Sequence, residues 1–114
     1  MGGEQCIFCA IASGRIPSQR VAESADVVAF RDVHPQAPTH VLVAPRRHIS
    51  GVEDLPGDDP LWNELFQMVR EVARVERLTT GYRVVVNQGE DGGQTVGHLH
   101  VHVLGGRALT WPPG

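Results

Sequence analysis

The sequence predicts a single α+β domain in which one long helix covers a mainly antiparallel sheet of about five strands. Two features of the 114-residue chain support this prediction. Short apolar segments separated by short connections favour antiparallel pairing, since parallel strands need long crossovers. One longer segment repeats apolar residues at helical spacing and supplies the covering helix. A chain of this length can bury roughly two-thirds of its unfolded surface in one core.

The first half of the chain is expected to contain a short helix and three strands. Residues 6–12 are predicted to form one or two helical turns, which Ser13 and Gly14 close and Pro17 stops. The segment 33–39 contains two prolines, which donate no ladder hydrogen bond, and it is therefore predicted to be a loop. The strands are expected at residues 21–23, 27–31 and 40–44.

The second half is expected to contain the long helix and two further strands. Asp58, Asp59 and Pro60 are typical of a helix start, and the helix is predicted to run from about residue 60 to residue 78. Its apolar stripe would consist of Leu61, Leu65, Phe66, Val69, Val72 and Ala73. The strands are expected at residues 82–87 and 98–104.

The last predicted strand alternates imidazole and apolar side chains with the period of a β-strand. This alternation places His98, His100 and His102 on one face, roughly 6.6 Å apart along the strand. The residues expected to face the core are Leu99, Val101 and Val103. Three imidazoles aligned on one face indicate either a metal site or nucleophilic chemistry.

The loop that precedes the histidines, residues 90–97, contains three glycines. Glycine lets backbone N–H groups approach an anion closely, because it has no Cβ and tolerates a positive φ. A glycine-rich loop alone is most often just a turn. Because this one leads directly into the histidines, it favours a phosphate group held beside the imidazoles.

The composition excludes several classes of partner. A formal net charge of −3 gives no basic surface for duplex nucleic acid. No apolar run is long enough to span a membrane, and the first residues do not resemble a secretory signal. We therefore expect a cytoplasmic protein with no nucleic-acid or membrane partner. In that compartment the C-x-x-C pair Cys6 and Cys9 indicates a metal or redox pair rather than a structural disulfide.

The histidine segment resembles the signature of the histidine triad (HIT) superfamily, in which His-x-His-x-His is followed by two apolar residues. The similarity extends over nearly the whole chain and is to the nucleotide-binding, phosphoramidase branch (HINT). The similar segments are residues 16–17, 30–32, 35–40, 81–83, 87, 92–94, 104–107 and 111–114. The resemblance implies a single HIT domain over residues 1–114 with a HIT-like fold. It also implies a homodimer with the long helix at the interface and the sheets joined across the two-fold axis.

The resemblance implies hydrolysis of a purine nucleoside 5′-phosphoramidate or acyl-nucleotide, with release of the nucleoside monophosphate. His100 would attack the α-phosphate and form a covalent nucleotidyl-histidine, which water then hydrolyses. The backbone carbonyl of His98 would accept the proton on the other ring nitrogen of His100. His102 and the N–H groups of the glycine loop would bind phosphate oxygens. Thr95 would hydrogen-bond near the bridging atom, and His40 would complete the histidine cluster.

For the nucleoside, the resemblance implies that Asp32 binds the ribose hydroxyls. Asn87, Gly93 and Gln94 would lie near the phosphate. The base would occupy an apolar slot formed by Ile7, Phe8, Ile11, Phe30, Val33 and Leu42. Residues such as Phe30 and Leu42 are equally typical of half-buried core strands, so both readings stay open for them.

The two ends of the chain are expected to differ in role. Residues 1–5 are expected to form a flexible N-terminus. The tail, residues 107–114, contains Trp111, which the resemblance places at the rim of the partner subunit's nucleotide pocket.

Some members of the superfamily bind a structural zinc ion through a C-x-x-C pair and two histidines. The matching residues in this sequence are Cys6, Cys9, His48 and His98. Two sulfur and two imidazole nitrogen ligands form a closed tetrahedral set of the structural kind. The alternatives are a redox pair at a helix start and two inert thiols of the core.

Other functions remain open from the sequence. His98, His100 and His102 could together hold a catalytic metal, although three histidines in line suit one tetrahedral centre poorly. The chain could also be a nucleotide-binding regulatory module with little turnover, or a dinucleoside polyphosphate hydrolase. We expect no catalytic metal and no organic cofactor.

Overall fold

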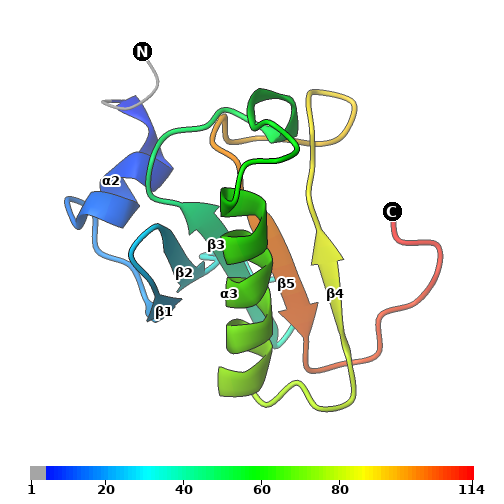
Figure 1. The fold of residues 1–114 in the computed structure, drawn as a ribbon. Helices are drawn as coiled ribbons and strands as arrows, with labels where there is room; N and C mark the ends of the chain where they lie inside the picture. Colours follow the sequence, from blue (N-terminus) through cyan, green and yellow to red (C-terminus); the bar gives the residue numbers. More distant parts are fainter. Residues whose placement is uncertain (1–4) are drawn as a thin grey trace.

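The computed structural model describes residues 5–114 and contains one five-stranded antiparallel sheet in the order β1-β2-β3-β5-β4. Helix α3 crosses one face of this sheet, and the C-terminal tail extends beyond the edge strand β4 (Figure 1). The elements are α2 (Ile7–Ser13), β1 (Arg20–Glu23), β2 (Val27–Arg31), β3 (Thr39–Pro45), the 3-10 helix η1 (Val52–Asp54), α3 (Leu61–Val75), β4 (Tyr82–Val85) and β5 (Val101–Gly105). The predicted α+β class and antiparallel sheet are confirmed. Of the predicted flexible N-terminus, residues 1–4 lie outside the described residues.

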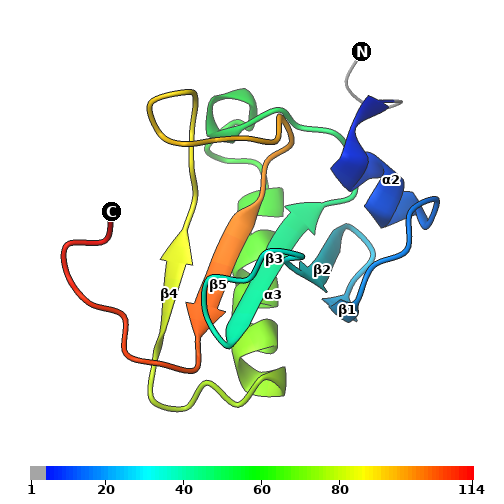
Figure 2. The same cartoon turned by 180° about the vertical axis from the view of Figure 1, so that it is seen from behind.

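Strands β2 and β3 supply two separate cores, one on each face of the sheet, because successive side chains of a strand point to opposite faces. The larger core lies under α3 and includes Val27, Ala29, Val41, Val43, Leu65, Val72, Leu99, Val101 and Val103. The smaller core lies under α2, at the back of the sheet (Figure 2), and includes Phe8, Ile11, Ala12, Val28, Phe30, Leu42 and Ala44. Strand β3 is therefore buried at all seven of its positions.

Helix α3 ends earlier than predicted, at Val75. Its end is a Schellman-type turn, in which the Leu78 N–H donates to the Ala73 carbonyl at 2.9 Å and the Arg77 N–H donates to the Arg74 carbonyl at 3.2 Å. Arg77 occupies the left-handed position of this turn, with φ of 58°. Apolar periodicity alone does not reveal such an ending, because the usual signal is a glycine and the chain has arginine there.

The predicted apolar stripe of α3 is wrong at Phe66, whose side chain is 43% exposed. Met68, which was not in the stripe, is buried instead. The residues at i, i+3, i+4 and i+7 from Leu65 face the sheet, and Phe66 lies one residue to the side of that row. Phe66 is therefore a surface residue.

The histidine segment joins the sheet later than predicted, because β5 begins at Val101. Val43 is the last residue of β3 that pairs with β5, and the Leu99 N–H donates instead to the Ile49 carbonyl at 2.6 Å. Leu99 is nevertheless buried in the larger core, as are the other two residues predicted to face it. Strand β4 likewise ends at Val85, before the predicted boundary at residue 87.

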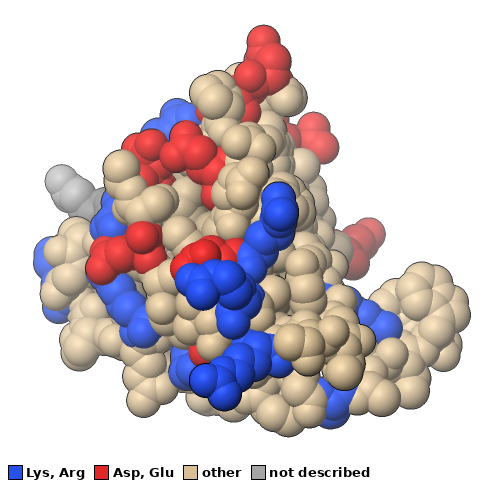
Figure 3. All heavy atoms as spheres, turned by 60° about the horizontal axis from the view of Figure 1, so that its bottom comes forward, with Lys and Arg blue, Asp and Glu red and all other residues tan. Residues whose placement is uncertain are grey.

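All ten basic side chains of the protein are arginines. On the face seen in Figure 3, basic and acidic groups lie close together. Ion pairs of the protein include Arg46 with Glu23 at 2.6 Å and Arg31 with Glu76 at 2.8 Å. Within the described residues, no helix has the length and apolar character needed to cross a membrane.

Candidate active site

His100 is held in one orientation by the backbone of the chain just before it. Its Nδ1 atom lies 2.7 Å from the carbonyl oxygen of His98, and the pair is buried. A carbonyl can only accept, so Nδ1 carries the proton and Nε2 of the neutral ring keeps its lone pair. The Phe8 ring lies edge-on to the His100 ring, with the centroids 5.0 Å apart. The structure therefore holds the His100 ring in one orientation, with the lone pair of Nε2 in the neutral ring pointing in a fixed direction.

A chain of hydrogen bonds also fixes the ring of His102. The backbone N–H of Gln36 donates to His40 Nδ1 at 3.0 Å, so the proton of neutral His40 lies on Nε2. His40 Nε2 lies 2.9 Å from His102 Nδ1, which must then accept. The proton of His102 consequently lies on its Nε2 atom. His102 thus offers an N–H group, while His100 beside it offers a lone pair, with ring centroids 5.0 Å apart.

The carboxylate of Asp32 lies at the outer end of this chain. Its Oδ2 atom is 3.4 Å from His40 Nε2, and its Oδ1 atom accepts the His34 N–H at 2.8 Å. Asp32 directly follows β2, and its own N–H donates to the His40 carbonyl. Although Asp32, His40 and His102 could together hold a metal ion, the Gln36 N–H would oppose one. A metal ion bound to His40 Nε2 would leave the ring proton of His40 on Nδ1. That N–H would then face the Gln36 N–H, and two donors cannot bond to each other.

Burial keeps the imidazoles of His40 and His102 neutral near neutral pH. Burial, together with the neighbouring rings of His100 and His40, lowers the pKa of His102 to about 4, against an opposing effect of Asp32. Burial also lowers the pKa of His40, which Asp32 partly offsets. Near neutral pH both rings are therefore hydrogen-bonding groups rather than charges.

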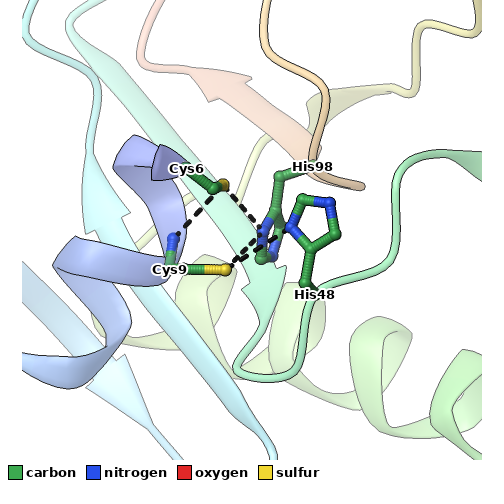
Figure 4. A group of neighbouring side chains, drawn as sticks. All are labelled: Cys6, Cys9, His48 and His98. Carbon is green, nitrogen blue, oxygen red and sulfur yellow. Dashed lines mark hydrogen bonds between the residues drawn. The ribbon is translucent and has the colours of Figure 1, made fainter. Parts of the chain in front are cut away.

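The ring of His98 points toward the two cysteines (Figure 4). Its Nδ1 atom lies 3.3 Å from Cys6 Sγ and 3.5 Å from Cys9 Sγ. Nδ1 of His48, which follows β3, lies 3.4 Å from Cys9 Sγ. The ligand atoms of these four residues all lie within 4.8 Å of one another. The structure therefore brings together all four residues of the predicted zinc set.

The chemistry of this thiol–imidazole cluster suits a metal. His98 Nε2 donates to the Pro45 carbonyl at 2.8 Å, so the Nδ1 lone pair is directed at the thiols. Tetrahedral zinc with ordinary Zn–S and Zn–N bonds holds its sulfur and nitrogen ligands roughly 3.5 Å apart. The observed separations match that spacing. Burial raises the pKa of the Cys9 thiol, and Cys6 raises it further, so a bound metal would have to displace the thiol proton.

The predicted base slot divides into buried and exposed members. Phe8, Ile11, Phe30 and Leu42 belong to the smaller core under α2, each no more than 8% exposed. Ile7 and Val33 are exposed, at 49% and 83%. Trp111 lies in the tail and is 81% exposed, so its ring has little contact within its own chain. Four of the predicted slot residues are therefore core residues, of which Phe8 contacts the His100 ring, while Ile7 and Val33 are accessible from outside.

The glycine loop is held by its own hydrogen bonds. The N–H groups of Gly93 and Gln94 donate to Glu90 and Gly89 within the loop, at 3.0 Å each. The side-chain amide of Gln94 donates to the Ser50 carbonyl at 2.8 Å and ties the loop to the chain after β3. These two backbone N–H groups are thus already used in this structure. Asn87 is half-buried at the start of the loop.

Thr95 lines both clefts beside this loop. One cleft, of about 520 Å³, also contains Asp54 and Glu90, and the other, of about 370 Å³, also contains Ile7 and His48. The predicted leaving-group residue is therefore open to a ligand from two sides.

Two contributors to this site were missed from the sequence, the N–H of Gln36 and the carbonyl of Pro45. Both act through backbone atoms, and a residue letter does not reveal where a main-chain group points. The residues 35–40 were singled out only as a resemblance, which gave no role to the Gln36 peptide.

A five-stranded antiparallel sheet with alternate histidines running into β5, and with the His40 imidazole bonded to the last of them, is typical of the histidine triad class. Residues 13–109 match the HIT domain family, and the chain belongs to this family. An uncharacterised HIT-like protein of Synechococcus elongatus is 47% identical over 112 residues, covering 97% of this chain and 98% of the relative.

Solved structures agree with this assignment. A HIT family hydrolase from Legionella pneumophila Philadelphia 1 is 46% identical, with a TM-score of 0.93, covering 96% of this chain and 100% of that chain. A histidine triad nucleotide-binding protein from Candida albicans is 31% identical, with a TM-score of 0.82, covering 95% of this chain and 83% of that chain.

Proposed function

We propose that this protein is a HINT-type hydrolase of purine nucleoside 5′-phosphoramidates or acyl-nucleotides, acting through a covalent nucleotidyl-histidine. The observation that supports it most is the bond from His100 Nδ1 to the His98 carbonyl, which leaves Nε2 as a fixed, uncharged nucleophile. The names of two structural neighbours, a HIT family hydrolase and a histidine triad nucleotide-binding protein, agree with hydrolysis and with a nucleotide ligand.

The first step forms a bond between His100 Nε2 and the α-phosphorus. The bond from phosphorus to the leaving atom breaks, and its electron pair departs with the leaving group. The carboxylate of an acyl-nucleotide departs without taking up a proton. The amine of a phosphoramidate takes up a proton from solvent beside Thr95 as it departs. His102 stabilises a phosphate oxygen through its Nε2–H, a hydrogen bond that strengthens as negative charge builds up in the transition state.

The second step reverses the covalent attachment. Water attacks phosphorus, its proton passes to solvent, and the electron pair of the P–N bond returns to His100 Nε2. The nucleoside monophosphate is released, and the proton consumed when an amine departs is restored. The imidazolium that exists between the steps is stabilised by its Nδ1–H bond to the His98 carbonyl.

The nucleoside would lie over the face that holds the histidines. Asp32 would accept hydrogen bonds from the ribose hydroxyls, and the base would rest on the buried floor of Phe8 and Phe30 with Ile7 and Val33 at its sides. Asn87 and the loop residues before His98 would surround the phosphate.

We further propose that the thiol–imidazole cluster holds a structural zinc ion. Cys6, Cys9, His48 and His98 are the ligands, and a closed set of four leaves no position for substrate. The ion would tie α2 to the sheet and restrain His98, whose carbonyl orients His100.

We also propose that the protein is a homodimer. Edge strand β4 leaves Tyr82 and Val84 exposed, and α3 leaves Phe66 and Val75 exposed. An exposed sheet edge beside apolar side chains is a surface that pairing would cover. The tail with Trp111 would then reach the nucleotide pocket of the partner.

The test is a panel of nucleoside phosphoramidates, acyl-nucleotides and dinucleoside polyphosphates, with mass spectrometry of the intact protein during turnover. We expect turnover of the first two classes and a transient mass increase equal to one nucleotidyl group. Preferential cleavage of the dinucleoside polyphosphates would instead support a dinucleoside polyphosphate hydrolase. Binding without turnover of any compound would support a regulatory module.

A further inference from the structure

The peptide backbone at Gln36 connects the catalytic histidines to the C-terminal tail. Its N–H donates to His40 Nδ1 at 3.0 Å, and its carbonyl oxygen accepts a hydrogen bond from Arg107 Nη2 at 3.0 Å. Arg107 lies in the tail, just after β5 ends at Gly105. One residue of the loop between β2 and β3 is therefore held at both of its main-chain polar groups, once by a histidine and once by the tail.

The tail is also packed directly against this loop. Gly106 has φ of 91°, and a Cβ atom at this position would lie 2.9 Å from Pro38 Cβ. Only glycine permits so close an approach with that backbone conformation. Arg107 consequently leaves the sheet at a fixed point beside the loop, within reach of the Gln36 carbonyl.

The loop has internal bonds of its own, but none of them fixes the main chain of Gln36. Asp32 accepts from the His34 N–H, and the Gln36 side chain donates to the His34 carbonyl at 3.0 Å. The first bond lies at the start of the loop, and the second uses a flexible side chain. Within the described residues, two side chains from outside the loop bind the Gln36 backbone, His40 at its N–H and Arg107 at its carbonyl.

We propose that Arg107 is a positioning residue that sets the protonation pattern of His40 and His102 through the backbone of Gln36. While Gln36 keeps its N–H on His40 Nδ1, His40 must carry its proton on Nε2, and His102 must accept it on Nδ1. That arrangement leaves the His102 Nε2–H directed at the substrate. The consequence for turnover rests on the proposed function, whereas the protonation pattern does not.

Loss of the Arg107 bond releases the loop and lets His40 adopt its other neutral form. His40 Nε2 then accepts from His102 Nδ1–H, and His102 Nε2 presents a lone pair to the phosphate oxygen. The titratable groups that face His102 are His100 just before β5, His40 on β3 and Asp32 after β2. A second proton on His102 would restore the Nε2–H, but the pKa of His102 is about 4, so the defect is expected to persist between pH 6 and pH 8.

The experiment compares wild-type protein with Arg107→Ala, Arg107→Lys and Arg83→Ala. Arg83 holds the same tail through the carbonyls of Leu109 and Thr110, at 3.3 and 2.7 Å, without touching Gln36. The first readout is nitrogen-15 NMR of the histidine rings without substrate, which reports which ring nitrogen carries the proton. The second is kcat/KM for a nucleoside phosphoramidate between pH 6 and 8.

Arg107→Ala is expected to shift both rings toward the opposite tautomer and to lower kcat/KM about fivefold to tenfold at pH 8, the size of one lost hydrogen bond. The loss should be similar at pH 6 and at pH 8. Arg107→Lys keeps a hydrogen-bond donor and should restore most of the wild-type tautomers of His40 and His102. Arg83→Ala should keep the wild-type tautomers. Unchanged ring signals in Arg107→Ala, or equal changes in Arg83→Ala, would overturn the proposal. A tautomer shift in a protein without any turnover would uphold it and refute the proposed function instead.

Discussion

A hydrogen bond between His98 and His100 connects the thiol–imidazole cluster to the candidate active site. The side chain of His98 faces Cys6 and Cys9, while its backbone carbonyl accepts the Nδ1–H of His100 at 2.7 Å. One residue therefore belongs to the thiol–imidazole cluster through its ring and to the candidate active site through its main chain. A disturbance of the cluster is expected to reach the nucleophile through this residue.

Replacement of His100 tests the nucleophile. His100→Asn is expected to lower turnover of a nucleoside phosphoramidate at least roughly a thousandfold, since no other group forms the covalent intermediate. AMP binding, measured by calorimetry, should change little, because Asp32 and the apolar floor remain. Wild-type turnover in His100→Asn or in His100→Ala would contradict the assignment.

Removal of the metal tests the cluster. Native mass spectrometry of reduced protein should find one zinc ion per chain, and a chelator should lower the melting temperature by roughly 10 °C. Turnover should also fall, because the His98 carbonyl loses its restraint. The double variant Cys6→Ser, Cys9→Ser is the control, and a chelator should not affect its melting temperature. A native mass equal to that of the bare chain would contradict the zinc proposal.

The lowered pKa of His102 predicts a loss of stability in acid. An unfolded histidine titrates near pH 6.5, whereas His102 in the folded chain has a pKa of about 4. Above pH 6.5 both states are neutral and the stabilisation is complete. As the pH falls from 6.5 toward 4, the unfolded chain binds a proton that the folded chain does not, so stability is lost. Urea unfolding at pH 7 and pH 4.5 should show a loss roughly 1–3 kcal/mol larger for wild-type protein than for His102→Asn. An equal loss in both would show that another group is responsible.

The ion pair between Arg31 and Glu76 is expected to stabilise the contact between β2 and the end of α3. The guanidinium makes two bonds of 2.8 Å to the carboxylate, and the Glu76 side chain is only 12% exposed. Glu76→Gln should lower the free energy of unfolding by roughly 1 kcal/mol. The exposed pair of Arg74 with Glu71 provides the control, because Glu71→Gln should lower the free energy of unfolding by clearly less. Equal effects in the two variants would mean that burial of the pair contributes nothing.

A charge on the edge strand tests the dimer. Val84→Lys places an ammonium group on the exposed apolar side of β4 and is expected to convert a dimer to a monomer in sedimentation velocity. Ile16→Lys is the matched control, since Ile16 has a similar exposure of 39% but lies near α2. A wild-type protein that sediments as a monomer would contradict the proposal directly.

The sequence predicted the sheet and most of its strands because alternation and turn residues are local signals. It failed where a tertiary contact decides the outcome. The carbonyl of Ile49 draws the chain around Leu99 out of the ladder, and Arg77 ends α3 at a position where a glycine would have given the signal. Phe66 fits a helical apolar pattern, and only the orientation of the helix on the sheet shows that it is exposed.

For the candidate site, side-chain positions were more predictable than main-chain roles. The set of Cys6, Cys9, His48 and His98 was assembled from resemblance, and the structure brings its ligand atoms together. The proton positions on His40 and His102 were not predictable, because they follow from where the Gln36 N–H points. The bound base, the metal and the partner subunit stay predictions.

The burial of strand β3 has a consequence for how this protein unfolds. It is buried along its whole length between the two cores, its second residue is His40, and the carbonyl of its last residue, Pro45, holds His98. Opening of this strand would disturb the thiol–imidazole cluster and the active-site histidines together, since both depend on it. Amide hydrogens of β3 should therefore exchange only through complete unfolding, and the two centres should melt as one cooperative unit.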